Sequence, residues 1–370
     1  MKRKILIENN QALGDIAMLT TAVRDLMQAH GDKFEVNVRT GAMALWENNP
    51  HITNFDPSGP DVERIYADYP LIHKSNQAPV HFIHGFREDL EQKLKVEIPC
   101  GDWAGSIYIS DLEKSWFSAP REILGKDVPY WVMNAGHKND FTAKKWGAHN
   151  YQAVIDGCPD VTFVQVGHND GGVHHKHPRL TGRNLINLVG QTDERQLIRL
   201  IYNAFGVITP VSAHMVLSYL IPANHRFKSR GGGQRMSRAC VVIAGGREPN
   251  HWQQGANQQY LHTCGMLDCC DNGGCWKGRV EALHDGDEKD TETCFFPVTT
   301  PDGRIAKCMS MITPDMVIRC VRNYMDNLKE QDDDKSDLHS DGRRIPEVHE
   351  RPAEQPGCLR EQGPGLFDDL

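Results

Sequence analysis

The sequence has no long apolar run. None of its 370 residues form a stretch that approaches the roughly 20 apolar residues a helix needs to cross a bilayer. The first residues, Met1-Lys2-Arg3-Lys4-Ile5-Leu6-Ile7, join basic side chains to a very short apolar run, so they predict a first β-strand and not a signal peptide. We therefore expect a cytoplasmic protein without a transmembrane segment.

An excess of basic charge is also missing. The formal net charge is −8, and much of the acid lies after residue 329, so nucleic acid is not expected as the main partner. There is no G-x-G-x-x-G fingerprint, which leaves a dinucleotide-dependent dehydrogenase without support, and no internal repeat. The length allows two domains of ordinary size, and 39% hydrophobic and 24% charged residues are typical of a soluble protein.

The stretch 130–220 carries most of the information. Short apolar runs alternate there with helical patterns, which is typical of βα units and a parallel sheet. We expect helices over 148–157, 192–204 and 212–220, and strands over 130–134, 161–167, 185–189, 206–209 and 239–244.

Two of these strand ends suit a phosphorylated ligand. One is followed by Asn134-Ala135-Gly136 and then by Lys144-Lys145-Trp146. The other continues into Thr209-Pro210-Val211-Ser212, where Ser212 can cap the next helix. Helix N-termini offer free N–H groups and a positive dipole end to anions, and open α/β sheets bind ligands beyond the carboxyl ends of their strands.

The N-terminal part predicts a second, smaller α/β unit. A strand over 1–9 leads through a turn into a helix, whose apolar positions 16, 19, 23 and 26 have helical spacing. Further strands are expected at 34–38 and 80–84, a helix at 87–96, and an interdomain connection within 110–129.

These motifs, in this order, resemble glycosyltransferase family 9, the ADP-heptose:lipopolysaccharide heptosyltransferase family. The Asn134-Ala135-Gly136 and Lys144-Lys145-Trp146 runs are similar to that family's phosphate loop and Lys-x-Trp motif, and 188–208 is similar to the run before its nucleotide-binding helix. The resemblance covers the chain up to about residue 328. It implies an α/β fold of the GT-B type, with two Rossmann-like domains facing each other across a cleft.

The resemblance also implies a catalytic acid. The family keeps it in a Gly-Asp pair after the first strand, which Gly14-Asp15 matches. Asp15 would then be the general base that takes the proton from an acceptor hydroxyl during transfer with inversion, with Gly14 and Thr20 on the acceptor side. The alternative for Asp15 is a turn or N-cap aspartate.

Donor binding is implied for the second domain. Lys144 matches the Lys-x-Trp lysine and would neutralise the leaving diphosphate; the alternative is a lysine on a solvated helix face. The 209–212 loop departs from the Asp-Thr-Gly that many members carry, and either His214 or Val216 aligns with the histidine that follows it. The predicted donor residues are Asn134, Gly136, Lys144, Thr209, Pro210, Val211, Ser212, His214 and Met215.

Cysteines are concentrated near the C-terminus. Seven of the eleven fall within 264–320, on irregular gaps that do not fit a helix. Four thiolates on short loops fit a tetrahedral site for zinc or a mononuclear iron; the alternative is free buried thiols. The predicted ligands are Cys275, Cys294, Cys308 and either Cys270, which we favour, or Cys269.

This cluster resembles the bacterial autotransporter heptosyltransferase branch of the same family. Cys275-Trp276, Cys294 and Cys308 before Ile312-Thr313-Pro314 match that branch, in which four cysteines hold iron. The resemblance implies a structural four-cysteine site and slightly favours a protein acceptor. A separate run, His174-His175-Lys176-His177, suggests a metal-dependent hydrolase as a lesser alternative.

The predicted domains are 1–125 on the acceptor side, 126–262 for the nucleotide-sugar, a Cys-rich metal-binding segment over 263–311, a helix over 312–328 and a disordered acidic tail over 329–370. A mobile loop is expected at 225–238. We expect an inverting bacterial glycosyltransferase that moves a sugar, heptose by resemblance, from an ADP-heptose-like donor to a lipopolysaccharide, other glycan, lipid-linked or protein hydroxyl, and that forms a homo-oligomer. The main alternative is a nucleotide-sugar-binding module without activity.

Overall fold

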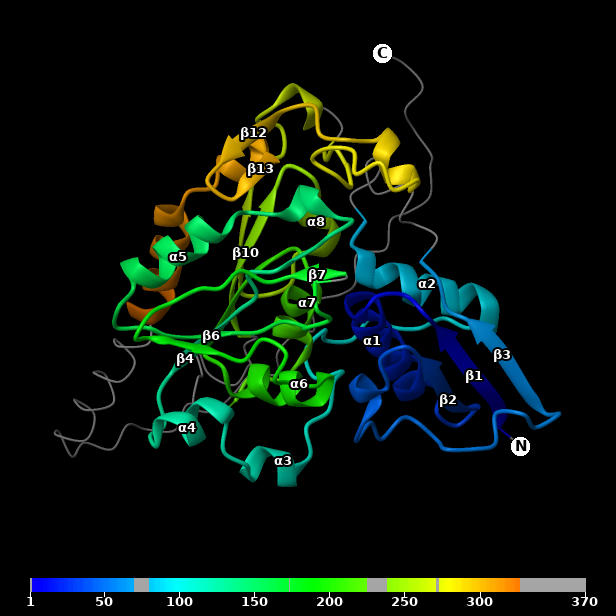
Figure 1. The fold of residues 1–370 in the computed structure, drawn as a ribbon. Helices are drawn as coiled ribbons and strands as arrows, with labels where there is room; N and C mark the ends of the chain where they lie inside the picture. Colours follow the sequence, from blue (N-terminus) through cyan, green and yellow to red (C-terminus); the bar gives the residue numbers. More distant parts are fainter. Residues whose placement is uncertain (1, 70–79, 173, 225–237, 271–272, 327–370) are drawn as a thin grey trace, which may run out of the picture.

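The computed structural model describes residues 2–69, 80–172, 174–224, 238–270 and 273–326. The loop expected at 225–238, apart from Arg238, and the tail expected at 329–370 lie outside these ranges. Two blocks stand side by side, a smaller one with β1–β3 and a larger one with β4, β6 and β10 (Figure 1). Within the described ranges, every helix is too short or too polar to cross a bilayer.

The smaller block is built on a parallel three-stranded sheet. Its order is β2-β1-β3, with β1 Arg3–Asn9, β2 Phe34–Thr40 and β3 Val62–Tyr66. Because β1 is central, its apolar residues Ile5, Leu6 and Ile7 are buried on both faces. The block's other elements are α1 Leu13–His30, η1 Met43–Trp46 and α2 Phe82–Leu94.

The larger block holds a parallel six-stranded sheet of order β11-β10-β9-β4-β6-β8. The strands are β4 Tyr130–Met133, β6 Thr162–Gln165, β8 Leu185–Asn187, β9 Gly206–Pro210, β10 Ala239–Gly245 and β11 Gln258–His262. The main helices are α5 Ala148–Gly157, α6 Glu194–Asn203 and α7 Ala213–Leu220, with short α8 Asn250–Gln253. The helices and strands expected over 130–245 are confirmed to within about two residues at most ends.

The expected strand at 80–84 is wrong. The chain starts α2 there, because the His81 side chain accepts a hydrogen bond from the Ile83 N–H and caps the helix. Phe82, Phe86 and Leu90 then recur every four residues and are buried on one helix face. The alternation Val-His-Phe-Ile-His that suggested a strand is shorter than this helical pattern.

The two blocks share one continuous apolar core, which contains Ile5 and Leu19 of the smaller block and Val132 and Met215 of the larger. The helices α1 and α7 meet between the sheets, where a Cβ on Gly14 would lie 3.3 Å from the Ala213 Cα.

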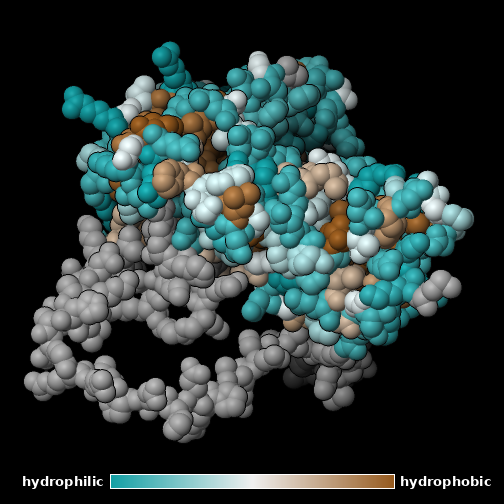
Figure 2. Space-filling view, turned by 90° about the horizontal axis from the view of Figure 1, so that it is seen from below, coloured by the Kyte–Doolittle hydropathy of each residue, from teal (hydrophilic) through white to brown (hydrophobic). Residues whose placement is uncertain are grey.

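A connection within 110–129 contains α3 Asp111–Ser115 and α4 Ala119–Leu124. Arg195 of α6 forms a buried two-point ion pair with Glu113 of α3, at 2.6 Å and 2.7 Å, so this connection is held firmly against the larger block. Figure 2 shows the surface on this side, which is mostly hydrophilic with separate apolar patches. Exposed side chains of α3, α4 and the link between them include Leu112, Phe117 and Ile123.

The cysteine-bearing segment after β11 packs on the larger block. It contains η5 Asp268–Cys270, η6 Glu288–Thr291, a hairpin of β12 Pro297–Thr300 and β13 Gly303–Ala306, and α9 Lys307–Ser310. Residues 314–326 are helical, as expected for 312–328. Two further short elements lie near this segment. One is a ribbon of β5 His137–Lys138 with β7 His175–Lys176, and the other is the helix η3 Thr142–Lys144, which contacts both β5 and β13.

Candidate active site

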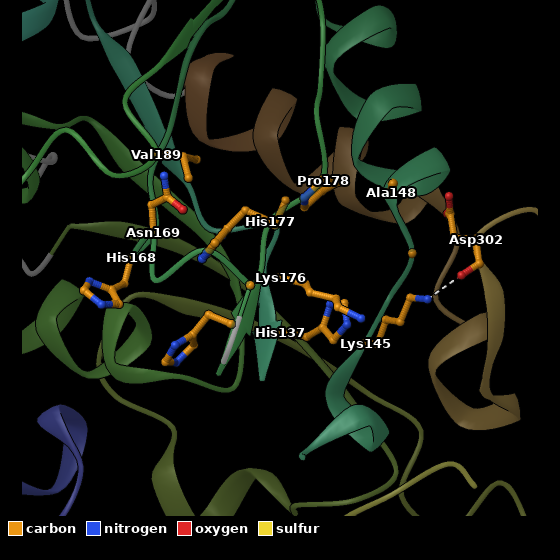
Figure 3. A pocket seen from close by; sticks show the side chains of 14 residues that line it. His137, Lys145, Ala148, His168, Asn169, Lys176, His177, Pro178, Val189 and Asp302 are labelled. Carbon is orange, nitrogen blue, oxygen red and sulfur yellow. Dashed lines mark hydrogen bonds between the residues drawn. The ribbon is translucent and has the colours of Figure 1, made fainter. Parts of the chain in front are cut away.

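A cavity of about 460 Å³ opens at the carboxyl ends of β4, β6 and β8 (Figure 3). Ala135 follows β4, Asn169 follows β6 and Val189 follows β8, so the cavity lies where open α/β sheets bind ligands. Its other wall is made by Gly147 and Ala148 at the start of α5. The remaining lining residues are His137, Lys145, His168, Gly172, His175, Lys176, His177, Pro178 and Asp302.

The predicted donor residues at two strand ends are brought together. The Asn134 side-chain N–H donates to the Ser212 hydroxyl at 3.4 Å, and Asn134 Nδ2 lies 3.1 Å from His214 Nδ1. The Gly136 N–H donates to Asn134 Oδ1, which fixes the turn after β4. Ser212 occupies the N-cap position of α7, but its hydroxyl contacts Thr209 Oγ at 2.7 Å and makes no capping bond. The expected cap is therefore absent from this side chain.

The other predicted donor residues of this loop and of the start of α7 are buried. Thr209, Pro210 and Val211 are buried, and the Val211 carbonyl accepts from Lys144 Nζ at 3.3 Å. Met215 is part of the core, so its side chain does not reach the site. Thr20 is also away from the site, because its hydroxyl is buried against Ser106 and the Ala17 carbonyl.

Neutral histidines surround the strand ends. The His177 ring lies against two glycines, since a Cβ on Gly136 or Gly167 would come within 2.2 Å or 2.0 Å of it. Burial, together with His177, lowers the pKa of His214 to about 4, and burial followed by Lys145 lowers that of His137 to about 4. Both ring nitrogens of His177 and Nε2 of His214 are buried with no hydrogen-bond partner among the described residues. The hydrogen-bonding capacity of these nitrogens is thus not used by the described residues.

Asp15 enters the site from the smaller block, as the third residue of α1. Its carboxylate accepts a hydrogen bond from the Ala12 N–H at 3.1 Å, so Asp15 helps to cap the helix from its third position, whereas the N-cap residue itself is Ala12. Burial raises the pKa of Asp15, and the Ala12 N–H, Lys144 and Lys138 offset part of this increase. The carboxyl group therefore lies near two lysines of the other block as well as capping its own helix.

Lys144 ends η3 and does not lie on a solvated helix face. Its side chain is 28% exposed, and its Nζ forms an ion pair with Glu248 at 2.8 Å. Burial, followed by the nearby Arg247, lowers the pKa of Lys144 well below its usual value. Lys144 and Asp15 also act on each other electrostatically, which connects the predicted lysine with the predicted base.

Glu248 and Arg247 were missed in the sequence. Glu248 is 2% exposed, contacts Lys144 and Arg247, and accepts from Gln253 at 2.8 Å. Both residues follow β10, every residue of which is buried. A charged pair directly after a wholly apolar strand, at the carboxyl end of the sheet, was the signal that could have identified them.

The predicted metal ligands converge near the end of β10. Cys270 Sγ lies 3.5 Å from the Gly246 carbonyl, and a Cβ on Gly246 would lie 3.2 Å from the Cys308 Cβ. Cys269, Cys275, Cys294 and Cys308 line a small cavity of about 10 Å³. Burial, with further repulsion from the neighbouring cysteines, raises the pKa of Cys308 to about 11.

The donor type fits a soft metal ion, because all of these side chains are thiols. Their placement is less complete: in the part of the chain that the structure describes, which omits 271–272, no three His, Cys, Asp or Glu side chains form a group that could hold a metal ion. The same finding applies to the histidine run. His174 is exposed, and the backbone N–H groups of His174 and His175 donate to Asp170.

No protein-family model and no curated protein matches the sequence. Solved structures match the fold. A glycosyl transferase family 9 structure from Veillonella parvula has a TM-score of 0.55 at 14% identity, over 89% of this chain and 98% of that one. The iron-containing dodecameric glycosyltransferase TibC from enterotoxigenic E. coli has a TM-score of 0.50 at 14% identity, over 88% and 77%. The chain thus has a mixed α/β fold with a parallel sheet, similar to the fold of these two structures.

Proposed function

We propose that the chain is a glycosyltransferase that moves a sugar from a nucleotide-diphosphate donor to a hydroxyl acceptor, with inversion and with Asp15 as general base. The observation that carries the proposal is the position of Asp15. It comes from the smaller block, yet it interacts electrostatically with Lys144 of the larger block, and its neighbour Gly14 packs against Ala213 at the start of α7.

The cavity is the proposed donor site. Its volume of about 460 Å³ lies within the range of ordinary small-molecule pockets. Lys144 and the N-terminus of α7 would take the diphosphate, because a cation and free N–H groups both stabilise developing negative charge. Ser212 supports the second role, since its hydroxyl does not occupy those N–H groups. The family resemblance makes ADP-heptose the first donor to test.

The proposed reaction is one displacement. The acceptor oxygen forms a bond to the anomeric carbon as the bond to the diphosphate oxygen breaks, and the hydroxyl proton moves to Asp15. A base works best when its pKa approaches the working pH, and burial moves the pKa of Asp15 in that direction. The negative charge of the leaving diphosphate favours the protonated form of Lys144, whose pKa is lowered in the unliganded protein.

The cysteine site is proposed as structural. Cys270, Cys275, Cys294 and Cys308 would hold iron or zinc, with Cys269 as the alternative to Cys270. The support is that Cys275, Cys294, Cys308 and the alternative Cys269 line one small cavity, that Cys270 Sγ contacts the Gly246 carbonyl after β10, and that all of these side chains are thiols. Such a metal would supply a cross-link between the end of β10 and the hairpin. A cytoplasmic location, a homo-oligomer and a glycan, lipid-linked or protein acceptor complete the proposal.

The function is tested by turnover. Purified protein is mixed with ADP-, UDP- and GDP-sugars, ADP-heptose included, and with sugar and peptide hydroxyl acceptors, and release of the nucleotide diphosphate is measured. Acceptor-dependent release from one donor, with an inverted anomeric bond in the product by NMR, is the expected result. Donor binding without release from any donor–acceptor pair would favour the binding module instead.

A further inference from the structure

The β12–β13 hairpin of the cysteine-bearing segment reaches the donor cavity. The hairpin lies between Cys294 and Cys308, and its turn carries Asp302. Asp302 lines the cavity together with Lys145 and Ala148, and Figure 3 shows it on the α5 side of the site. The segment that carries the cysteines therefore also supplies part of the cavity wall.

Asp302 is held in a fixed position. Its Oδ2 accepts from the His149 backbone N–H at 2.9 Å and contacts the His149 ring Nδ1 at 2.5 Å. Lys145 Nζ donates to the Asp302 carbonyl, drawn as the dashed line in Figure 3. Burial alone would raise the pKa of Asp302, but the hydrogen bonds from His149 and the charges of His149 and Lys145 lower it. The carboxylate is thus ionised, and its side chain remains 24% exposed.

The Asp302 side chain differs chemically from the other residues that line the cavity. Among the described lining residues Asp302 is the only carboxylate, and the other charged side chains are Lys145 and Lys176. No hydrogen bond between described residues uses its Oδ1. A fixed carboxylate with one available oxygen accepts from hydroxyl groups, whereas a phosphate or a second carboxylate at the same place would be repelled. The 209–212 loop carries no acid that could do this.

We propose that Asp302 determines donor specificity by accepting hydrogen bonds from hydroxyl groups of the nucleotide-sugar, so that the site takes a neutral polyol there and rejects an anionic one. This rests on the proposed function, because it uses the same donor cavity. The hydroxyl groups have two sources, the ribose and the transferred sugar. Both present the same chemistry to a carboxylate, so the experiment must separate them.

The test uses the full chain and isothermal titration calorimetry. The best-bound nucleotide among ADP, UDP and GDP is compared with its 2′-deoxy and 3′-deoxy forms and with the matching sugar nucleotide, on the wild type and on Asp302→Asn. Asparagine keeps the size of the side chain and can still accept from the His149 N–H. His149→Ala is the control, because it removes the ring contact and leaves the carboxylate. Thermal unfolding of both variants shows whether they fold.

A charged acceptor lost from a bound hydroxyl predicts about 10- to 100-fold weaker binding. If Asp302 binds the ribose, Asp302→Asn weakens nucleotide binding. In this variant one of the deoxynucleotides then binds as tightly as the nucleotide, whereas in the wild type it binds more weakly. If Asp302 binds the transferred sugar, the affinity for the nucleotide is unchanged and only the affinity for the sugar nucleotide falls. His149→Ala, which keeps the carboxylate and its bond from the residue 149 backbone N–H, weakens binding less than Asp302→Asn in either case.

If Asp302→Asn weakens the binding of all four ligands equally, Asp302 has a structural role. If the binding of all four is unchanged, Asp302 does not contact the donor. Either result overturns this inference but leaves the proposed function standing. A wild type that binds no nucleotide at all would overturn the proposed function, and the inference with it.

Discussion

Replacing Glu248 with glutamine is expected to weaken both the fold and the donor site. The carboxylate is 2% exposed, contacts Lys144 at 2.8 Å and Arg247, and accepts from Gln253 at 2.8 Å. Glutamine keeps the shape but leaves two cations close together without their counter-charge. Breaking a buried ion pair costs about 3–5 kcal/mol. Because Lys144 is 28% exposed and water screens part of the loss, we expect about 2–3 kcal/mol in the free energy of unfolding.

Urea denaturation measures this change, and Glu63→Gln is the matched control. The Arg3–Glu63 pair is shorter still, at 2.6 Å, but its side chains are 49% and 41% exposed. Exposed pairs contribute at most about 1 kcal/mol, so this control should differ little from the wild type. In a double-mutant cycle, Glu248→Gln and Lys144→Met should be non-additive by at least about 1 kcal/mol. Equal stability of the Glu248 and Glu63 variants, or full additivity, would refute the reasoning.

Three further outcomes are expected. The raised pKa of Asp15 means that its ionised form destabilises the fold, so Asp15→Asn should be more stable than wild type at pH 7, with the difference lost as the pH falls below the ordinary aspartate pKa; urea titrations at several pH values check this. Gly167→Ala should displace the His177 ring, costing about 1–3 kcal/mol and weakening nucleotide binding by calorimetry, because its Cβ would come within 2.0 Å of that ring. Cys308→Ser should lower the metal content measured by elemental analysis, whereas the buried Cys158→Ser, outside the cluster, should not.

The sequence predicted the larger sheet well for a physical reason. Parallel strands buried on both faces, such as Ala239–Gly245, are continuous apolar runs, and these are visible without knowledge of their partners. The short run at 80–84 was misassigned as a strand, because a capping histidine and a helical apolar face decide its structure. Short irregular elements, such as the β12–β13 hairpin, have no such periodic pattern and were not predicted.

The candidate site was predicted in part. Asn134, Ser212 and His214 lie at strand ends and are close in space, as the topology of a parallel sheet requires. Glu248 and Asp302 were missed because their roles depend on partners 104 and 153 positions away in the chain, Lys144 and His149. The packing of the cysteine-bearing segment against η3 and α5 brings Asp302 to the cavity.

The turnover of Asp15→Asn, measured beside its donor affinity, is the most direct test of the account. Asparagine keeps the shape of the side chain but cannot take a proton. We expect donor binding within about threefold of the wild type and a turnover number lower by about 10²- to 10⁴-fold, as for the loss of a general base. A variant that binds the donor and turns it over as fast as the wild type would contradict the central claim.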